Sequence, residues 1–308
     1  MSLNLRRVYL SLFALLSLGI NSLAQEIALT FDDAPIRDGA YYSGPERTKT
    51  LIAKLKNSGV PQVAFFCMTA RMDARGAARI KQYAEAGHII ANHTHSHISM
   101  RQLGVKNYIE DIFKADEVLR KQQGFRSWFR YPFLDEGRTA EERDAIRQAL
   151  AERGYMNGYV TVDNYDWYLD RLLQTALRAK QKIDYEQLRR IYLEHLWKSI
   201  TFYDQMARTV LGRSPKHVLL LHENDLAALY VDELVILLRA KGWKIISPAE
   251  AYTDPIATNV PEVLLNNQGR VAAIAKASGY TGSFSQESED EAFLEKLFQS
   301  SGVIRTKR

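Results

Sequence analysis

The sequence has a single cysteine among its 308 residues, which excludes a disulfide bond within the chain. That residue, Cys67, lies in the apolar run VAFFCM, and this setting predicts a buried, unreactive thiol and not a nucleophile. The sequence also lacks a concentrated block of basic residues, since 41 lysines and arginines stand against 36 acidic residues. This composition gives nucleic-acid binding little support and allows only weak attraction to an anionic polymer.

Long apolar runs are scarce, and the one that stands out is at the N-terminus. Arg6 and Arg7 precede an apolar stretch from Val8 to Ile20, and residues 22–24 (SLA) are typical of a cleavage site. We therefore expect residues 1–24 to be a signal peptide, and the mature protein to be secreted or periplasmic with no stable membrane span. The alternative is an uncleaved N-terminal anchor, but the apolar stretch is short for a membrane span.

After residue 25, short β-type runs alternate with helical ones, which indicates an α/β fold with parallel strands. The expected strands are 26–31, 62–68, 88–92, 126–131, 155–162, 217–222 and 243–246. Helical candidates lie between them, for example 46–57 and 74–86. Seven strands with helical crossovers predict one (β/α) barrel, incompletely closed, better than two small sheets.

Two segments do not fit a simple barrel. Residues 168–212 have helical periodicity and a capping signal at 184–187 (DYEQ), so we expect a helical insertion on the rim of the barrel. Its aromatic residues Tyr192, Trp197 and Tyr203 could stack on sugar rings, although core packing is favoured at this helical spacing. Residues 254–308 are expected to form a C-terminal extension that ends in a short helix.

Unusual polar residues follow the expected strands at their carboxyl ends. The first strand runs into Asp32 and Asp33, the third into NHTHSH, the fourth into RYPF, the fifth into VDNYDW, and the sixth ends at His222. In a barrel these strand ends meet on one face, where such folds place their chemistry. The sequence therefore predicts a single polar site built from five separate segments.

The residue types at this site favour a metal. Adjacent carboxylates repel each other, and the usual remedies are a shared proton or a nearby cation. His93 and His97 are four residues apart, so both imidazoles reach one ion if the segment turns helically, and one aspartate completes an open catalytic site. The second aspartate could then take a proton from a water molecule activated by the cation, and His222 could protonate the leaving group.

Taken in order, TFDD (30–33), HTHSH (93–97), RYPF (130–133), DNYDW (163–167) and LLLH (219–222) resemble the five motifs of the polysaccharide deacetylase family. These are the NodB-homology, or carbohydrate esterase family 4, enzymes. The resemblance covers residues 25–253, apart from the helical stretch 168–212. It implies a NodB-like deacetylase domain over residues 25–253, with the insertion inside it and the extension after it.

The resemblance assigns the base and the metal ligands. It implies that Asp32 is the general base and that Asp33, His93 and His97 bind a divalent metal, usually Zn²⁺, with Co²⁺ or Ni²⁺ as alternatives. Arg130 would orient Asp32. One of the two adjacent carboxylates would then be neutralised by the metal, and the other would be held by the arginine.

The resemblance also assigns the residues around the substrate. The backbone N–H of Phe133, where the family usually has tyrosine, would hold the developing oxyanion. Trp167 and either Leu220 or Leu221, with Leu221 preferred, would line a small acetyl pocket. Asp166 would accept a hydrogen bond from His222, so that His222 can act as the catalytic acid. For Asp163, a site role and a turn-forming role remain open.

The expected activity is removal of acetyl groups from the N-acetylated sugars of a glycan, such as peptidoglycan or a chitin-like oligosaccharide. An O-acetyl esterase acting on acetylated xylan is an alternative, because the same site can attack either carbonyl. Removal of a formyl group from a lipid-linked sugar also stays open. A rival of another class is a non-catalytic carbohydrate-binding protein with the same fold.

Overall fold

The structure is a computed structural model, and it describes residues 24–305. The expected signal peptide, residues 1–24, therefore lies outside the described residues apart from Ala24. Among the residues that the structure describes, no helix is both long enough and apolar enough to cross a membrane.

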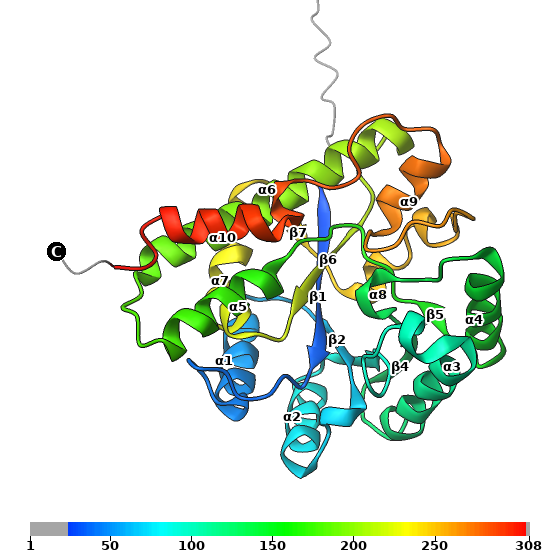
Figure 1. Ribbon diagram of the computed structural model, residues 1–308, viewed down its shortest axis with the longest axis horizontal. Coiled ribbons are helices and arrows are strands. Elements are labelled where there is room, and N and C mark those ends of the chain that lie inside the picture. The colour runs from blue at the N-terminus through cyan, green and yellow to red at the C-terminus, as the bar shows by residue number, and fades with distance from the viewer. Residues whose placement is uncertain (1–23, 306–308) are drawn as a thin grey trace, which may run out of the picture.

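Seven parallel strands form one curled sheet at the centre of the molecule (Figure 1). The strands follow the order β5-β4-β3-β2-β1-β6, and β7 pairs with the start of β1. Their bounds are β1 Glu26–Ala34, β2 Ala64–Cys67, β3 Ile89–Asn92, β4 Phe125–Phe129, β5 Met156–Asn157, β6 His217–His222 and β7 Lys244–Ile245. The expectation of an incompletely closed barrel with seven strands is confirmed.

The segment expected as one strand at 155–162 is split, and this split leaves the barrel incomplete. Residues 156–157 pair with β4, whereas Val162 makes an isolated parallel bridge to Leu219 of β6. Between them, Gly158 passes so close to the ring of Phe66 that an added Cβ would lie 2.5 Å from it. The carbonyl of Gly158 accepts a hydrogen bond from Nε of Arg130 (2.7 Å). The segment thus crosses from one edge of the sheet to the other, and a single bridge joins it to β6.

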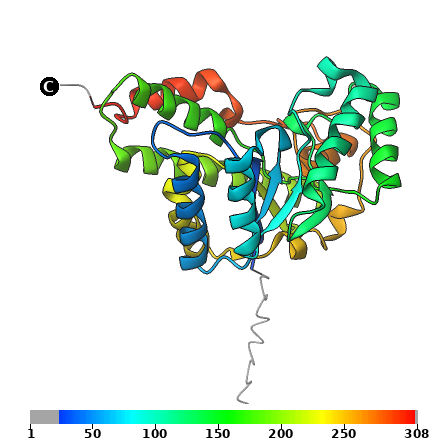
Figure 2. The same ribbon diagram turned by 90° about the horizontal axis from the view of Figure 1, so that it is seen from below.

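Helices surround the curled sheet (Figures 1 and 2). Their bounds are α1 Gly44–Asn57, α2 Ala74–Glu85, α3 Met100–Leu119, α4 Ala140–Glu152, α5 Asp166–Arg178, α6 Tyr185–Leu211, α7 Asp225–Ala240, α8 Pro248–Ala251, α9 Arg270–Ala277 and α10 Glu291–Ser300. The capping signal DYEQ is confirmed, because the Asp184 side chain accepts hydrogen bonds from the backbone N–H groups of Glu186 and Gln187. Cys67 is fully buried, as expected, and burial raises the pKa of its thiol.

The inserted helices α5 and α6 belong to the main hydrophobic core. α6 packs against α7 and α9, and its Tyr192 and Tyr203 are completely buried in the core. The hypothesis that these two tyrosines stack on sugar rings is therefore wrong, and their core packing is confirmed. α9 and α10 pack on α6 and α5 (Figure 1), so the segment after residue 253 shares the same core.

Candidate active site

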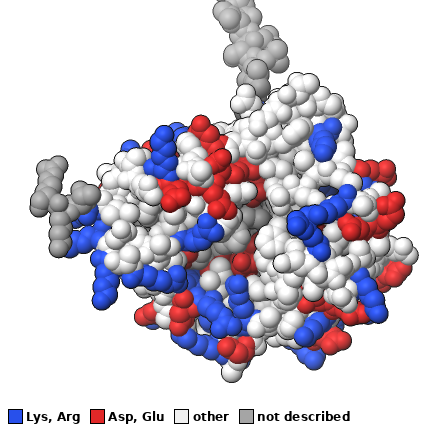
Figure 3. Space-filling view, viewed as in Figure 1, with Lys and Arg blue, Asp and Glu red and all other residues white. Residues whose placement is uncertain are grey.

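A cavity of about 290 Å³ opens at the carboxyl ends of the strands. Figure 3 shows that this face of the molecule is hollowed near its centre, with acidic side chains around the hollow and basic side chains on its flanks. The cavity gathers residues from all five segments that the sequence singled out. The predicted residues that line it are Asp32, Asp33, His93, His97, Phe133, Trp167 and His222.

Asp33, His93 and His97 form a compact cluster in this cavity. One potential ligand atom from each residue lies within 4.8 Å of the other two. Oδ1 of Asp33 is 3.2 Å from Nε2 of His97 and 3.6 Å from Nε2 of His93. The turn that brings the histidines together is not helical, which corrects the expectation from their spacing. It uses left-handed backbone at Thr94 (φ 69°) and His97 (φ 58°) instead.

A neighbouring hydrogen bond fixes which nitrogen of His93 faces the cluster. Nδ1 of His93 lies 2.8 Å from the carbonyl oxygen of Arg130, so this nitrogen is the donor and Nε2 is left as a ligand atom. His95 points elsewhere, as expected, and its Nδ1 lies 2.8 Å from the hydroxyl of Thr69. His93 is buried, and desolvation lowers the pKa of its imidazole to about 4. A neutral imidazole is the form that binds a metal.

The three residues fit a divalent cation. Oδ1 of Asp33 is buried and has no hydrogen-bond partner among the described residues, which is costly for a carboxylate oxygen. Burial by itself would raise the pKa of Asp33, but its electrostatic interactions with His97, His222, His93 and Arg71 outweigh burial and lower the pKa. One carboxylate and two imidazoles are the donor set of open zinc sites and related metal sites. A cation at this point would satisfy the buried oxygen.

Asp32 is held apart from this cluster by Arg130. Oδ1 of Asp32 accepts a hydrogen bond of 2.6 Å from Nη1 of Arg130, and both side chains are almost completely buried. Nη1 of Arg130 also donates to the hydroxyl of Thr30 (2.8 Å). The other oxygen of Asp32 faces His93, with 3.7 Å between Oδ2 and Nε2. The adjacent carboxylates therefore differ in their partners, since Asp32 pairs with the guanidinium of Arg130 and Asp33 faces both imidazoles.

His222, which is partly buried, and Asp166, which is completely buried, form a second pair at the cavity wall. Nδ1 of His222 lies 2.6 Å from Oδ1 of Asp166, and Oδ2 of Asp166 accepts a hydrogen bond from Asn224 (3.1 Å). Burial lowers the pKa of His222, but the charge and hydrogen bond of Asp166, together with the nearby Asp33 and Asp32, raise it to about 9. His222 is thus protonated at neutral pH.

The structure places the three expected substrate-binding residues differently. Trp167 lines the cavity, and Phe133 stands at its mouth with 52% of its surface exposed and its ring centre 4.7 Å from that of His97. Leu221, in contrast, is completely buried in the hydrophobic core, while Leu220 lines the cavity. The preference for Leu221 is corrected to Leu220, because successive residues of a strand point to opposite faces.

Further residues line the cavity that the sequence left open or missed: Tyr131, Leu134, Asp163, Tyr165 and Asn267. Asp163 is buried, and desolvation together with the charge of Glu289 raises the pKa of its carboxyl well above the usual range. Asp163 belongs to the DNYDW motif, so the sequence did point to it as a site residue. Asn267 lies beyond all five motifs, and nothing in its local sequence points to the site.

Comparison with known proteins gives a consistent result. Residues 20–158 match the model of the family described as polysaccharide deacetylase. A peptidoglycan-N-acetylglucosamine deacetylase from Bacillus cereus is 31% identical over 143 residues, which are 46% of this chain and 46% of that protein. The match therefore spans about half the length of this relative.

Two solved structures are similar to the fold. One is a peptidoglycan N-acetylglucosamine deacetylase, Bc1960, with a TM-score of 0.50 and 22% identity over 74% of this chain and 88% of the other. The second is a carbohydrate esterase family 4 pseudoenzyme from Bacillus anthracis, with a TM-score of 0.52 and 16% identity over 74% of this chain and 66% of the other. At these identities the two structures support the shared fold alone.

Proposed function

Because residues 20–158 match its family model, this chain belongs to the polysaccharide deacetylase family, and on that premise we propose that it is a metal-dependent hydrolase that removes acetyl groups from N-acetylated sugars. One observation carries the proposal. The Asp33, His93 and His97 cluster shares a single cavity with a carboxylate held by an arginine and with a protonated histidine. A ligand set, a base and an acid therefore face one space that is large enough for an acetylated sugar.

Asp33, His93 and His97 are the residues that would hold the cation. When bound, a divalent cation supplies Lewis-acid chemistry, because it polarises an acyl carbonyl and lowers the pKa of water. The donor set suits Zn²⁺, and Co²⁺ or Ni²⁺ suit the same ligands. Nδ1 of His93, bonded to the carbonyl of Arg130, keeps the ring oriented toward this position.

Asp32 acts as the general base in this proposal. Its carboxylate accepts a proton from the water that attacks the acyl carbon. The hydrogen bond from Nη1 of Arg130 fixes the orientation of the carboxylate, and Thr30 in turn holds Nη1. The backbone N–H of Phe133 is the proposed donor to the oxygen that becomes negative as the carbonyl is attacked.

His222 acts as the acid. When the C–N bond breaks, the imidazolium donates its proton to the amine nitrogen of the sugar, and acetate and a free amine are the products. Asp166 accepts the hydrogen bond from Nδ1, so the proton that is transferred is the one on Nε2. Trp167 and Leu220 provide an apolar wall suited to the acetyl methyl group.

The proposed substrate is an N-acetylated glycan of the peptidoglycan class. The support is the 31% identical relative from Bacillus cereus, whose name gives peptidoglycan N-acetylglucosamine as its target. We also propose that the protein is exported to the periplasm or the medium, where such glycans are found, on the strength of the N-terminal sequence.

A non-catalytic role is the second candidate, because a pseudoenzyme has the same fold. Acetate release from peptidoglycan glycan strands, chitooligosaccharides and acetylated xylan, with metal content measured on the same sample, separates the candidates. We expect acetate from the N-acetylated glycans and one divalent ion per chain. Glycan binding without acetate release from the metal-loaded protein would favour the non-catalytic role. Release from xylan alone would identify an O-acetyl esterase.

A further inference from the structure

A segment of the C-terminal extension crosses the loop that follows β4 and reaches the catalytic cavity. We call residues 259–269 the crossing segment. It contributes Asn267 to the cavity, and this residue has a left-handed backbone (φ 59°). The Asn267 side chain makes no hydrogen bond within the described part of the chain, so its amide donors and acceptor are free for a ligand.

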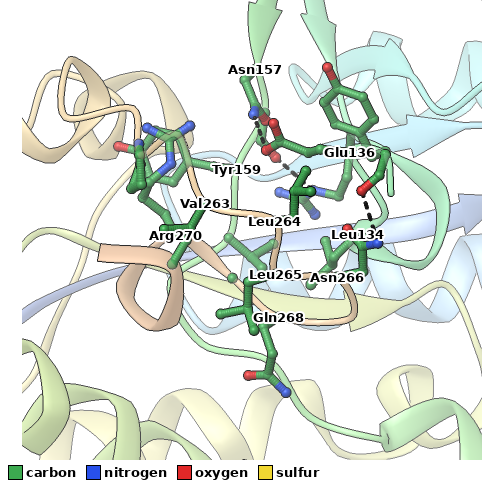
Figure 4. Close-up of a pocket in the computed structure, with 18 of the residues that line it drawn as sticks. Leu134, Glu136, Asn157, Tyr159, Val263, Leu264, Leu265, Asn266, Gln268 and Arg270 are labelled. Carbon is green, nitrogen blue, oxygen red and sulfur yellow. Dashed lines mark hydrogen bonds between the residues drawn. The ribbon is translucent and has the colours of Figure 1, made fainter. Parts of the chain in front are cut away.

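The crossing segment is packed firmly in place. Figure 4 shows its Leu264, Leu265 and Asn266 lying against Leu134 and Glu136 of the loop after β4. Only about 40 Å³ of space remains between the two segments. Hydrogen bonds support this packing at several points along the segment, because the carbonyl of Glu262 accepts one from Arg143 (2.6 Å), Asn266 donates to the carbonyl of Gly137 (3.1 Å), and Gln268 donates to Glu289 (2.7 Å).

Beyond Asn267 the catalytic cavity continues into a second hollow. The hollow has a volume of about 470 Å³, and both Phe133 and Asn267 line it as well as the catalytic cavity. Its other walls come from the start of α3 and from the loop after β4. Asn267 and Phe133 therefore stand at the border between two adjoining spaces, each of a size suited to about one sugar unit.

The side chains of the second hollow carry an excess of positive charge. Two guanidinium groups, those of Arg101 and Arg138, stand there against the single carboxylate of Asp135. Among the described residues, neither guanidinium has a carboxylate within salt-bridge distance, and Asp135 already accepts a hydrogen bond from the backbone of Gly137 (3.0 Å). An anionic group is thus favoured in the second hollow.

We propose that the second hollow is a sugar subsite that selects a unit bearing a carboxylate, next to the neutral N-acetylated unit in the catalytic cavity. Arg101 and Arg138 bind the carboxylate, and Asn267 binds hydroxyl or amide groups at the junction of the two units. This inference rests on the proposed function and names its substrate class more narrowly. The preferred glycan has a carboxylated sugar beside the sugar that is deacetylated.

The test compares two N-acetylated glycans of equal length, one neutral (chitotetraose) and one with a carboxylate on alternate sugars (peptide-free peptidoglycan strands). In the double variant Arg101→Gln, Arg138→Gln, we expect the KM for the carboxylated glycan to rise about tenfold or more, as for loss of charge-assisted hydrogen bonds. Its kcat, and both constants for the neutral glycan, should change little. Arg126→Gln is the matched control, because Arg126 is exposed at the amino end of β4, away from the site.

The variant Asn267→Gly removes the amide and keeps a residue that tolerates the left-handed backbone. We expect it to raise the KM for both glycans and to leave metal content unchanged. Equal effects of the double arginine variant on the two glycans, or no effect on either, would overturn the subsite.

Calorimetric binding of both glycans to Asp32→Asn protein provides a readout that does not depend on turnover. Tighter binding of the carboxylated glycan, lost in the arginine variants, supports the subsite even if the wild-type protein releases no acetate. Absence of acetate release therefore counts against the proposed function, whereas equal binding of the two glycans counts against the subsite.

Discussion

Nδ1 of His222 lies 2.6 Å from Oδ1 of Asp166, a carboxylate that is completely buried at the start of α5. The same carboxylate accepts a hydrogen bond from the backbone N–H of His222 (3.0 Å), so it holds both the ring and the main chain. The pair joins the end of β6 to the inserted helices. Asp166 is therefore the main cause of the raised pKa of His222, with smaller contributions from Asp33 and Asp32.

The pH profile tests this pair. The pKa of His222 is raised to about 9, so the acid is present below that pH and is lost as the pH rises through it. Because a bound cation would offset the contribution of Asp33, we expect the falling limb of kcat somewhat below pH 9. Asp166→Asn removes the main cause of the shift and should move this limb toward the ordinary histidine value of about 6.5. The pH of this limb is measured from full pH profiles of kcat for both proteins, with metal content as the control. A falling limb at the same pH in Asp166→Asn would exclude His222 as the acid.

Metal binding provides a second test with an internal control. His93→Ala and His97→Ala each remove one of three ligands, so metal content and activity should fall together. His95→Ala alters a histidine of the same motif that bonds to Thr69 outside the cluster, and it should keep its metal. Elemental analysis after dialysis against a chelator gives the comparison. Equal metal loss in all three variants would indicate a general disturbance of the loop and not loss of ligands.

Much of this site could be predicted because its residues sit at strand ends in recognisable motifs. Asp33, His93 and His97 come together as the strand order requires, since the carboxyl ends of parallel strands share one edge. The choice between Leu220 and Leu221 failed because HVLLLH is apolar throughout. A strand buried on both faces gives no alternation from which to read which side chain faces the cavity.

The split strand, the position of Asn267 and the burial of the two tyrosines depend on long-range packing, which no local sequence pattern indicates. The strand expected at 155–162 is split, and at the split Gly158 passes close to the ring of Phe66, a residue from another strand. Asn267 reaches the cavity only because the crossing segment packs on the loop after β4. Tyr192 and Tyr203 had the spacing of a helix face, and the positions of α7 and α9 show that this face is interior.

Glu223, next to His222, provides a test of stability. Its carboxylate is completely buried and accepts two hydrogen bonds from Arg79 (2.6 and 2.7 Å), one from the hydroxyl of Tyr83 (2.8 Å) and one from the backbone of Ile36 (2.7 Å). Glu223→Gln leaves the guanidinium of Arg79 buried without a counter-charge, so the free energy of unfolding should fall by about 3–5 kcal/mol.

Urea unfolding of both proteins measures this change. Glu295→Gln is the matched control, because Glu295 is exposed on α10, and exposed carboxylates contribute within about 0.5 kcal/mol. Equal stability of Glu223→Gln and the wild type would show that Arg79 finds another partner. The loop between β1 and α1, which contains Ile36, would then not depend on this carboxylate.

The adjacent aspartates should respond in opposite ways to the same substitution. Asp32→Asn preserves the shape of the side chain but removes its capacity to accept a proton, so turnover should fall by roughly 10² to 10⁴, the range for a positioned base. Metal content should stay close to one per chain, because Asp32 pairs with Arg130 and lies outside the ligand cluster. Asp33→Asn should instead lose metal and activity together, since it removes the only carboxylate of that cluster.

Added Zn²⁺ at high concentration should restore part of the activity of Asp33→Asn and none of that of Asp32→Asn. Loss of metal in both variants, with equal rescue, would mean that the two carboxylates share one role.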